Sequence, residues 1–183
     1  MFIEFEETPN PNTLKFLPGR EILKSGTREF KSREEAASAP LALKLFDIGG
    51  VEAVFYATDF LSVTKNDDQL WDDLKPEILT ALMDHFTSGG IVIEEAQGGS
   101  EDNSQLSEID RQIQELIDTR IKPAVAQDGG NIEFVEFDEG IVYLRLEGAC
   151  AGCPSASMTL KHGIESMLKH FVPEVLRVEP VEY

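Results

Sequence analysis

Residues 128–154 read DGGNIEFVEFDEGIVYLRLEGACAGCP and contain a helix stop, a hairpin, a cysteine pair and a helix start, in that order. Asp128-Gly129-Gly130-Asn131 interrupts an apolar helical pattern. Alternating apolar residues over 132–137 and 141–146 predict two strands. The turn between them, Asp138-Glu139-Gly140, has a glycine that can adopt positive φ. The stretch therefore predicts a β-hairpin that is followed by a cysteine-containing loop.

Helices are expected on both sides of this hairpin. Ser107 is the candidate N-cap of the first helix, and Pro173 ends the second, after which residues 176–178 predict a last strand. Both helices have an apolar stripe at helical spacing. The first stripe consists of Ile109, Ile113, Leu116, Ile117 and Ile121, and the second of Leu160, Ile164, Met167, Leu168 and Phe171. The order α-β-β-loop-α-β predicts a compact α+β module of about 75 residues.

The first half of the chain also has a mixed α+β pattern. Strands are expected at residues 2–5, 13–17 and 91–93, and a hairpin at residues 51–57 and 60–65. A helix is expected after Ser32, where Pro40 delays or breaks it. A second helix is expected to begin at Pro76 and to end at Gly89-Gly90. The apolar stripe assigned to the second helix is Leu79, Leu82, Met83 and Phe86.

Between the two halves, residues 96–105 contain no large apolar side chain and are rich in Gly, Ser and acidic residues. This composition is typical of a flexible, solvated linker. The alternative is a long surface loop within one domain. We therefore predict two small α+β domains, residues 1–95 and 106–183, joined by the linker 96–105.

Charge and composition exclude several classes of protein. The chain has 34 acidic and 16 basic residues, a formal net charge of −18, which is unsuited to binding nucleic-acid phosphates. No apolar run reaches the roughly 18 residues of a membrane span. The N-terminal residues are acidic, so we expect neither a signal nor a transit peptide. Two cysteines do not make a disulfide scaffold, which favours a reducing compartment.

Both cysteines of the chain, Cys150 and Cys153, lie in one C-x-x-C motif. Gly148 and Gly152 flank a tight loop, and Pro154 suits the first turn of the following helix. Cys153 is therefore expected at or near a helix N-terminus, where the helix dipole favours a thiolate. The spacing lets both sulfur atoms face one point, as in metal chelation or in a vicinal dithiol.

The number of available ligands separates the possible metal sites. A structural zinc site or a cubane iron–sulfur cluster takes four protein ligands, and the chain offers two thiols. His162 lies nine residues beyond Cys153, about 13 Å along a helix, and His170 is farther. His85 belongs to the other domain. Four thiolates therefore require a second copy of the chain across a two-fold axis. Such a shared, exposed site is expected to be labile, which suits a carrier.

The alternative is thiol–disulfide exchange, in which a C-x-x-C motif also opens a helix. Thioredoxin-like domains place this motif after an early strand of a βαβ unit, whereas here a helix and a hairpin precede it. The sequence contains no phosphate-binding glycine loop. Its acidic pairs are interpreted as solvated faces and helix caps, so we predict that the protein is not an enzyme.

Several motifs resemble a known family. Residues 118–123 (DTRIKP), 127–131 (QDGGN) and 148–156 (GACAGCPSA) are similar to the C-terminal NifU domain of Nfu iron–sulfur cluster scaffold proteins. Residues 8–16 (TPNPNTLKF) resemble the signature of the Nfu N-terminal domain. The two resemblances span nearly the whole chain.

The resemblance implies a carrier that holds a [4Fe–4S] cluster between two subunits and transfers it to apo-proteins, with a [2Fe–2S] form as the alternative. It implies that Cys150 and Cys153 are the cluster ligands and that residues 1–95 recognise partners. The implied partners are upstream cluster assembly proteins as donors and apo iron–sulfur enzymes as acceptors, together with a second copy of the chain in a cluster-dependent homodimer. We expect a bacterial cytoplasmic protein, with a mature mitochondrial matrix protein as the alternative.

Overall fold

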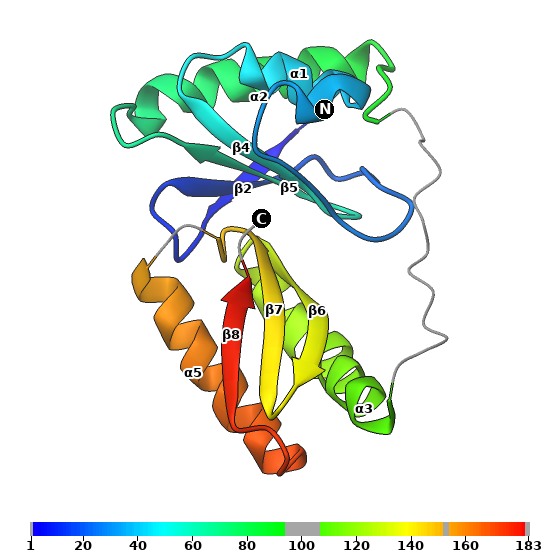
Figure 1. The fold of residues 1–183 in the computed structure, drawn as a ribbon. Coiled ribbons are helices and arrows are strands. Elements are labelled where there is room, and N and C mark those ends of the chain that lie inside the picture. The colour runs from blue at the N-terminus through cyan, green and yellow to red at the C-terminus, as the bar shows by residue number, and fades with distance from the viewer. Residues whose placement is uncertain (1, 94–106, 152–153, 182–183) are drawn as a thin grey trace. The chain divides into compact units, whose positions relative to one another are not determined.

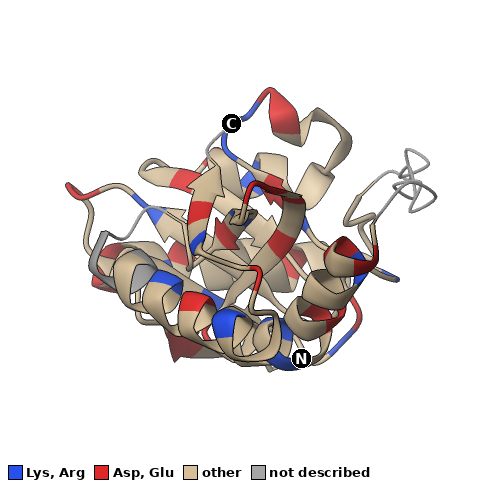
Figure 2. Cartoon of the chain, turned by 60° about the horizontal axis from the view of Figure 1, so that its bottom comes forward, with Lys and Arg blue, Asp and Glu red and all other residues tan. Residues whose placement is uncertain are grey.

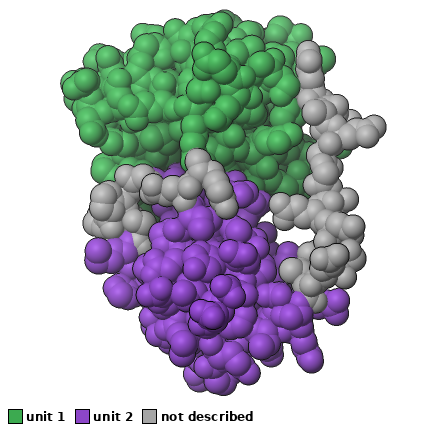
Figure 3. Space-filling view, in the orientation of Figure 1, with its two compact units in different colours: residues 1–98 green, residues 99–183 purple. Residues whose placement is uncertain are grey.

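The computed structural model describes residues 2–93, 107–151 and 154–181, with the side chains of 154–157 excluded. The chain forms two compact units, residues 1–98 and 99–183, which Figure 3 colours separately. Both units combine helices with a β-sheet, which confirms the prediction of two small α+β domains. The predicted linker, residues 96–105, lies outside the described residues. None of the described helices is long and apolar enough to cross a membrane.

Unit 1 is a five-stranded antiparallel sheet with helices on one face (Figure 1). The strand order is β1-β2-β5-β4-β3, so β1 and β3 form the edges. The helices and the inward side chains of the strands enclose one apolar core. The elements are β1 (Glu4–Glu7), β2 (Thr13–Leu17), β3 (Arg28–Phe30), the 3₁₀ helix η1 (Glu35–Ser38), α1 (Pro40–Phe46), β4 (Val51–Tyr56), β5 (Leu61–Lys65) and α2 (Trp71–Thr87).

The β4–β5 hairpin and the break at Pro40 are confirmed, whereas two predicted strands of unit 1 are wrong and one observed strand was not predicted. The first strand lies at Glu4–Glu7 instead of 2–5, and β3 was not predicted. Residues 91–93 form no strand. Val92 and Ile93 pack against the core without pairing with an edge of the sheet.

The start of α2 was also predicted wrongly, because Pro76 lies inside the helix. A proline there removes one backbone hydrogen bond, the one that would reach the carbonyl of Asp72. The turn before it still forms because Leu74 and Ile78 are buried, at 3% and 0% exposure. Met83, assigned to the core stripe, is 43% exposed. The packing of the whole helix on the sheet therefore outweighs the local preference of one proline.

His85 is a buried histidine on the core side of α2, 2% exposed. Within the described residues, neither of its ring nitrogens makes a hydrogen bond of regular geometry, although the backbone of Ile91 and Gly90 interacts with the ring and acts to raise its pKa. Burial lowers the pKa of His85 below its ordinary value of 6.5, and the positive charge of Lys44 lowers it further. The folded state therefore disfavours the protonated form of this imidazole.

We expect unit 1 to lose stability below about pH 6.5, because the unfolded chain then binds a proton that folded His85 does not. The loss ends once the pH falls below the pKa of folded His85. The variant His85→Leu is expected to flatten this pH dependence, whereas His162→Gln, at an exposed position, leaves it unchanged. Trp71, the only tryptophan, lies in α2, so urea unfolding followed by its fluorescence at several pH values makes the measurement. An equal pH slope in His85→Leu would contradict the assignment.

Unit 2 has the predicted order of elements around a three-stranded sheet, β6-β7-β8. The first two strands are antiparallel, and the last runs parallel to β7. Ser107 caps the first helix in a capping box with Asp110, as the sequence predicts. That helix continues through a π-helical turn that the sequence did not predict. The elements are α3 (Glu108–Leu116), η3 (Ile117–Ile121), α4 (Lys122–Gln127), β6 (Gly130–Asp138), β7 (Ile141–Gly148), α5 (Pro154–Phe171) and β8 (Arg177–Val181).

The core of unit 2 lies between its helices and the apolar face of its sheet. Ile132, Val142 and Val178 come from the three strands and are at most 2% exposed. Most predicted stripe residues of both helices pack into this core, but Phe171 is 41% exposed. Glu139 and Gly140 of the hairpin turn both have positive φ. This core fixes α5 and β7, the two elements that flank the cysteine loop.

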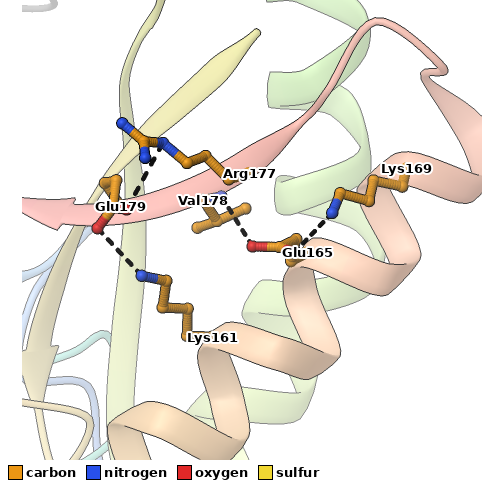
Figure 4. A network of polar contacts seen from close by, with 6 residues as sticks. All are labelled: Lys161, Glu165, Lys169, Arg177, Val178 and Glu179. Carbon is orange, nitrogen blue, oxygen red and sulfur yellow. Dashed lines mark hydrogen bonds and ion pairs between the residues drawn. The ribbon is translucent and has the colours of Figure 1, made fainter.

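A polar network joins α5 to the edge strand β8 (Figure 4). The Glu165 carboxylate accepts a hydrogen bond from the Val178 backbone N–H at 3.2 Å and one from Lys169 Nζ at 2.7 Å. Lys161 Nζ lies 3.0 Å from Glu179 Oε2. The hydrogen bond from Lys169, followed by that from Val178, lowers the pKa of Glu165 below 4.5. The network satisfies an edge-strand amide and holds α5 against the sheet.

The variant Glu165→Gln is expected to destabilise unit 2 at neutral pH, by no more than about 1 kcal/mol because Lys169 is solvent-exposed. The carboxylate contributes stability above pH 4.5 and loses it as the pH falls through the lowered pKa of the folded state. The free energy of unfolding of the variant therefore differs more from that of the parent protein at about pH 7 than at about pH 4. Urea unfolding followed by circular dichroism measures it, with exposed Glu174→Gln as control. A difference independent of pH would contradict the charge-based account.

Candidate metal centre

The cysteine loop joins the end of β7 to the start of α5. Gly148 ends the strand with φ of 63°, in the left-handed region, and α5 begins at Pro154 as predicted. Cys150 lies between them, and the Ala151 N–H donates a hydrogen bond to the Gly148 carbonyl at 3.1 Å. Cys153 directly precedes Pro154 in the sequence but lies outside the described residues. The predicted placement of the motif between strand and helix is thus confirmed, whereas Cys153 at the helix N-terminus stays a prediction.

Gly130, at the start of β6, forms the surface against which Cys150 packs. Gly130 pairs with Gly148 in the hairpin register. A Cβ atom built on Gly130 would lie 2.5 Å from Cys150 Sγ, 2.8 Å from the Glu147 carbonyl oxygen and 2.9 Å from the Cys150 backbone nitrogen. These distances are shorter than atomic contacts allow, so only glycine fits at this position without a shift of the loop.

Two further bonds tie the helix stop to the cysteine loop. The Ala149 N–H donates to the Gly129 carbonyl at 3.2 Å, and Asn131 Nδ2 donates to Glu147 Oε2 at 3.0 Å. The sequence analysis interpreted Asp128-Gly129-Gly130-Asn131 only as the end of a helix and missed this second role. The sequence did contain a signal for it. Gly129-Gly130 and Gly148 lie at opposite ends of the predicted hairpin, so pairing of its two strands brings them together.

The Cys150 side chain is buried, 6% exposed, and belongs to the core cluster of unit 2. The sequence analysis expected an exposed site, and for this thiol in this conformation that expectation is wrong. The sulfur lies over Gly130, where a missing side chain leaves space for it. In the described conformation the Cys150 thiol is therefore largely shielded from solvent.

Further ligands were sought among the described residues of one chain. Among the described residues, no group of three or more His, Cys, Asp or Glu side chains could hold a metal ion. His162 and His170 are exposed on α5, and His85 is buried in unit 1. Cys150 is the thiol that the described part of the chain offers. Thiolates are the ligands that iron–sulfur clusters use, so the donor chemistry fits half of a four-thiolate site.

The chain is thus a two-domain α+β protein whose two cysteines lie in the segment between a hairpin and a helix. Residues 3–89 match the family described as "Scaffold protein Nfu/NifU N terminal", and residues 113–179 match "NifU-like domain". The chain belongs to this Nfu family of iron–sulfur cluster scaffold proteins.

Curated relatives match over nearly all of this chain. The human protein named "NFU1 iron-sulfur cluster scaffold homolog, mitochondrial" is 46% identical over 99% of this chain and 72% of its own length. "NifU-like protein 4, mitochondrial" of Arabidopsis thaliana is 48% identical over 98% of this chain and 65% of its own length. A solution structure of a NifU-like protein from Saccharomyces cerevisiae covers 52% of this chain and 86% of that chain, at 30% identity and a TM-score of 0.48. The chain thus spans about two thirds of the curated relatives.

Proposed function

We propose that this protein carries a [4Fe–4S] cluster, bound between two copies of the chain by Cys150 and Cys153 of each, and transfers it to apo-proteins. The cluster is cargo for this protein. The observation that carries the proposal is the position of Cys150 in a strand–helix loop of a chain that offers two thiols in all. The names of the relatives, which describe cluster scaffolds, support the choice of cargo.

The transfer step that we propose is a ligand exchange. A thiolate of the acceptor protein forms one bond to iron as one cysteine thiolate of the carrier leaves, so the number of ligands is conserved. Because Cys150 is buried in the described conformation, we expect loading and release to proceed through transient exposure of this thiol.

Residues 1–95 are proposed to recognise partner proteins, namely apo iron–sulfur enzymes as acceptors and cluster assembly proteins as donors. The absence of cysteine from this half supports a role other than metal binding. The relatives' names support the mitochondrial alternative for localisation, and the bacterial cytoplasm stays a prediction from sequence.

Anaerobic reconstitution with iron and sulfide tests the proposal. We expect about four irons and four sulfides per dimer and a mostly monomeric apo-protein. Each chain has a net charge of −18, so added salt is expected to strengthen the dimer by screening repulsion. Chemical iron and sulfide analysis with light scattering makes the measurement. A colourless monomer whose thiols cycle between dithiol and disulfide would instead support thiol–disulfide exchange.

A further inference from the structure

A shallow, open groove lies between α1 and α2 in unit 1. Figure 1 shows that both helices belong to the layer that covers one face of the sheet. Its volume is about 550 Å³. Ile48, Pro76 and Ala81 contribute apolar surface to its lining. All of its residues belong to unit 1, and none lies in the cysteine loop, so the function proposed for unit 2 leaves this groove without a role.

The charged residues of the groove are mostly acidic. Asp47, Glu77 and Asp84 supply three carboxylates against the single ammonium group of Lys44. Asp47 is paired with Arg33. Within the described part of the chain, Glu77 and Asp84 form no ion pair or side-chain hydrogen bond. Both are exposed on α2, nearly two turns apart, and are available to a cationic ligand.

Acidic residues alone do not distinguish the groove from the rest of the surface. Figure 2 shows Asp and Glu spread over helices, strands and loops of the chain. The groove differs because unpaired carboxylates border a concave apolar surface. An apolar side chain seated there would lose contact with water, and flanking Lys or Arg side chains would meet Glu77 and Asp84. The groove therefore selects for a ligand that has both features.

We propose that the α1–α2 groove docks a short, cationic, amphipathic segment of a client apo-protein. The inference rests on the proposed carrier function and assigns the client-recognition surface within residues 1–95. The net charge of −18 steers cationic segments toward the chain from a distance, and the groove gives them a specific place to bind.

A short synthetic helix of leucine and lysine residues is the probe, titrated into the isotope-labelled, full-length apo-protein and followed by amide NMR. We expect shifts concentrated at Lys44–Ile48 and at Glu77–Asp84. The variant Glu77→Lys/Asp84→Lys is expected to weaken binding by about tenfold or more. The control Glu52→Lys/Asp59→Lys makes the same change in net charge at two exposed positions of unit 1 outside the groove and is expected to weaken binding much less.

Equal weakening by both double variants would show attraction by net charge alone and would overturn the inference. Shifts centred outside the groove would overturn it as well. A peptide with serine in place of leucine is expected not to bind. If it bound as tightly as the leucine–lysine peptide, the apolar surface of the groove would contribute nothing to binding. Because the apo-protein is used without iron, failure here is distinct from failure of the carrier function. Normal cluster loading without peptide binding would leave the carrier function intact and reject only the groove.

Discussion

Replacing Cys150 with alanine is expected to abolish cluster binding while the protein stays folded. Half of the proposed thiolate ligands of a two-chain site disappear, because each copy loses one of its two cysteines. Alanine introduces no polar group into the core around position 150, so the cost to stability is that of a small cavity. Iron and sulfide analysis after anaerobic reconstitution makes the measurement.

Cys153→Ala is the matched variant and is expected to give the same loss. Unfolding followed by circular dichroism provides the control for the fold, with cooperative unfolding expected in both variants. A normal iron and sulfide content in Cys150→Ala would contradict the assignment of the ligands. A loss of cluster together with a loss of cooperative unfolding would assign Cys150 a role in packing instead.

The variant Gly130→Ala is expected to shorten the lifetime of the bound cluster markedly without removing a ligand. The new methyl group would enter the space occupied by Cys150 Sγ and the backbone of the loop. Overpacking of this kind costs about 1–3 kcal/mol, and about 1.4 kcal/mol corresponds to a tenfold change in an equilibrium constant. The decay of the cluster absorbance under a chelator makes the measurement.

Gly163→Ala is the matched control for this prediction. Gly163 lies in α5, and a Cβ atom built on it would meet no atom within 4 Å. Alanine has the higher helix propensity, so this variant is expected to stabilise unit 2 by about 0.5–1 kcal/mol and to leave the cluster lifetime unchanged. An unchanged lifetime in Gly130→Ala would mean that the cluster-bound loop has moved away from Gly130. Equal changes in both variants would contradict the contact with Cys150 as the cause.

Much of the fold could be predicted from local signals. Ser107 predicts the start of α3, and the turn at Asp138-Glu139-Gly140 predicts the hairpin, because caps and tight turns depend on the residues themselves. The failures have a common cause. Pro76 opposes a helix locally, yet α2 passes through it because Leu74 and Ile78 pack into the core. Apolar residues 91–93 suit a strand, yet no edge of the sheet pairs with them.

By itself the sequence determined the two-part α+β organisation, the family resemblance and the limit of two thiols per chain, since these follow from composition, periodicity and motif order. Only the tertiary structure decided that Gly130 lies under Cys150, that this thiol is buried, and that α1 and α2 form a groove bordered by Glu77 and Asp84. Each of these depends on contacts between segments distant in the sequence. A one-dimensional pattern records which residues are apolar, charged or small, and packing in three dimensions determines which of them meet.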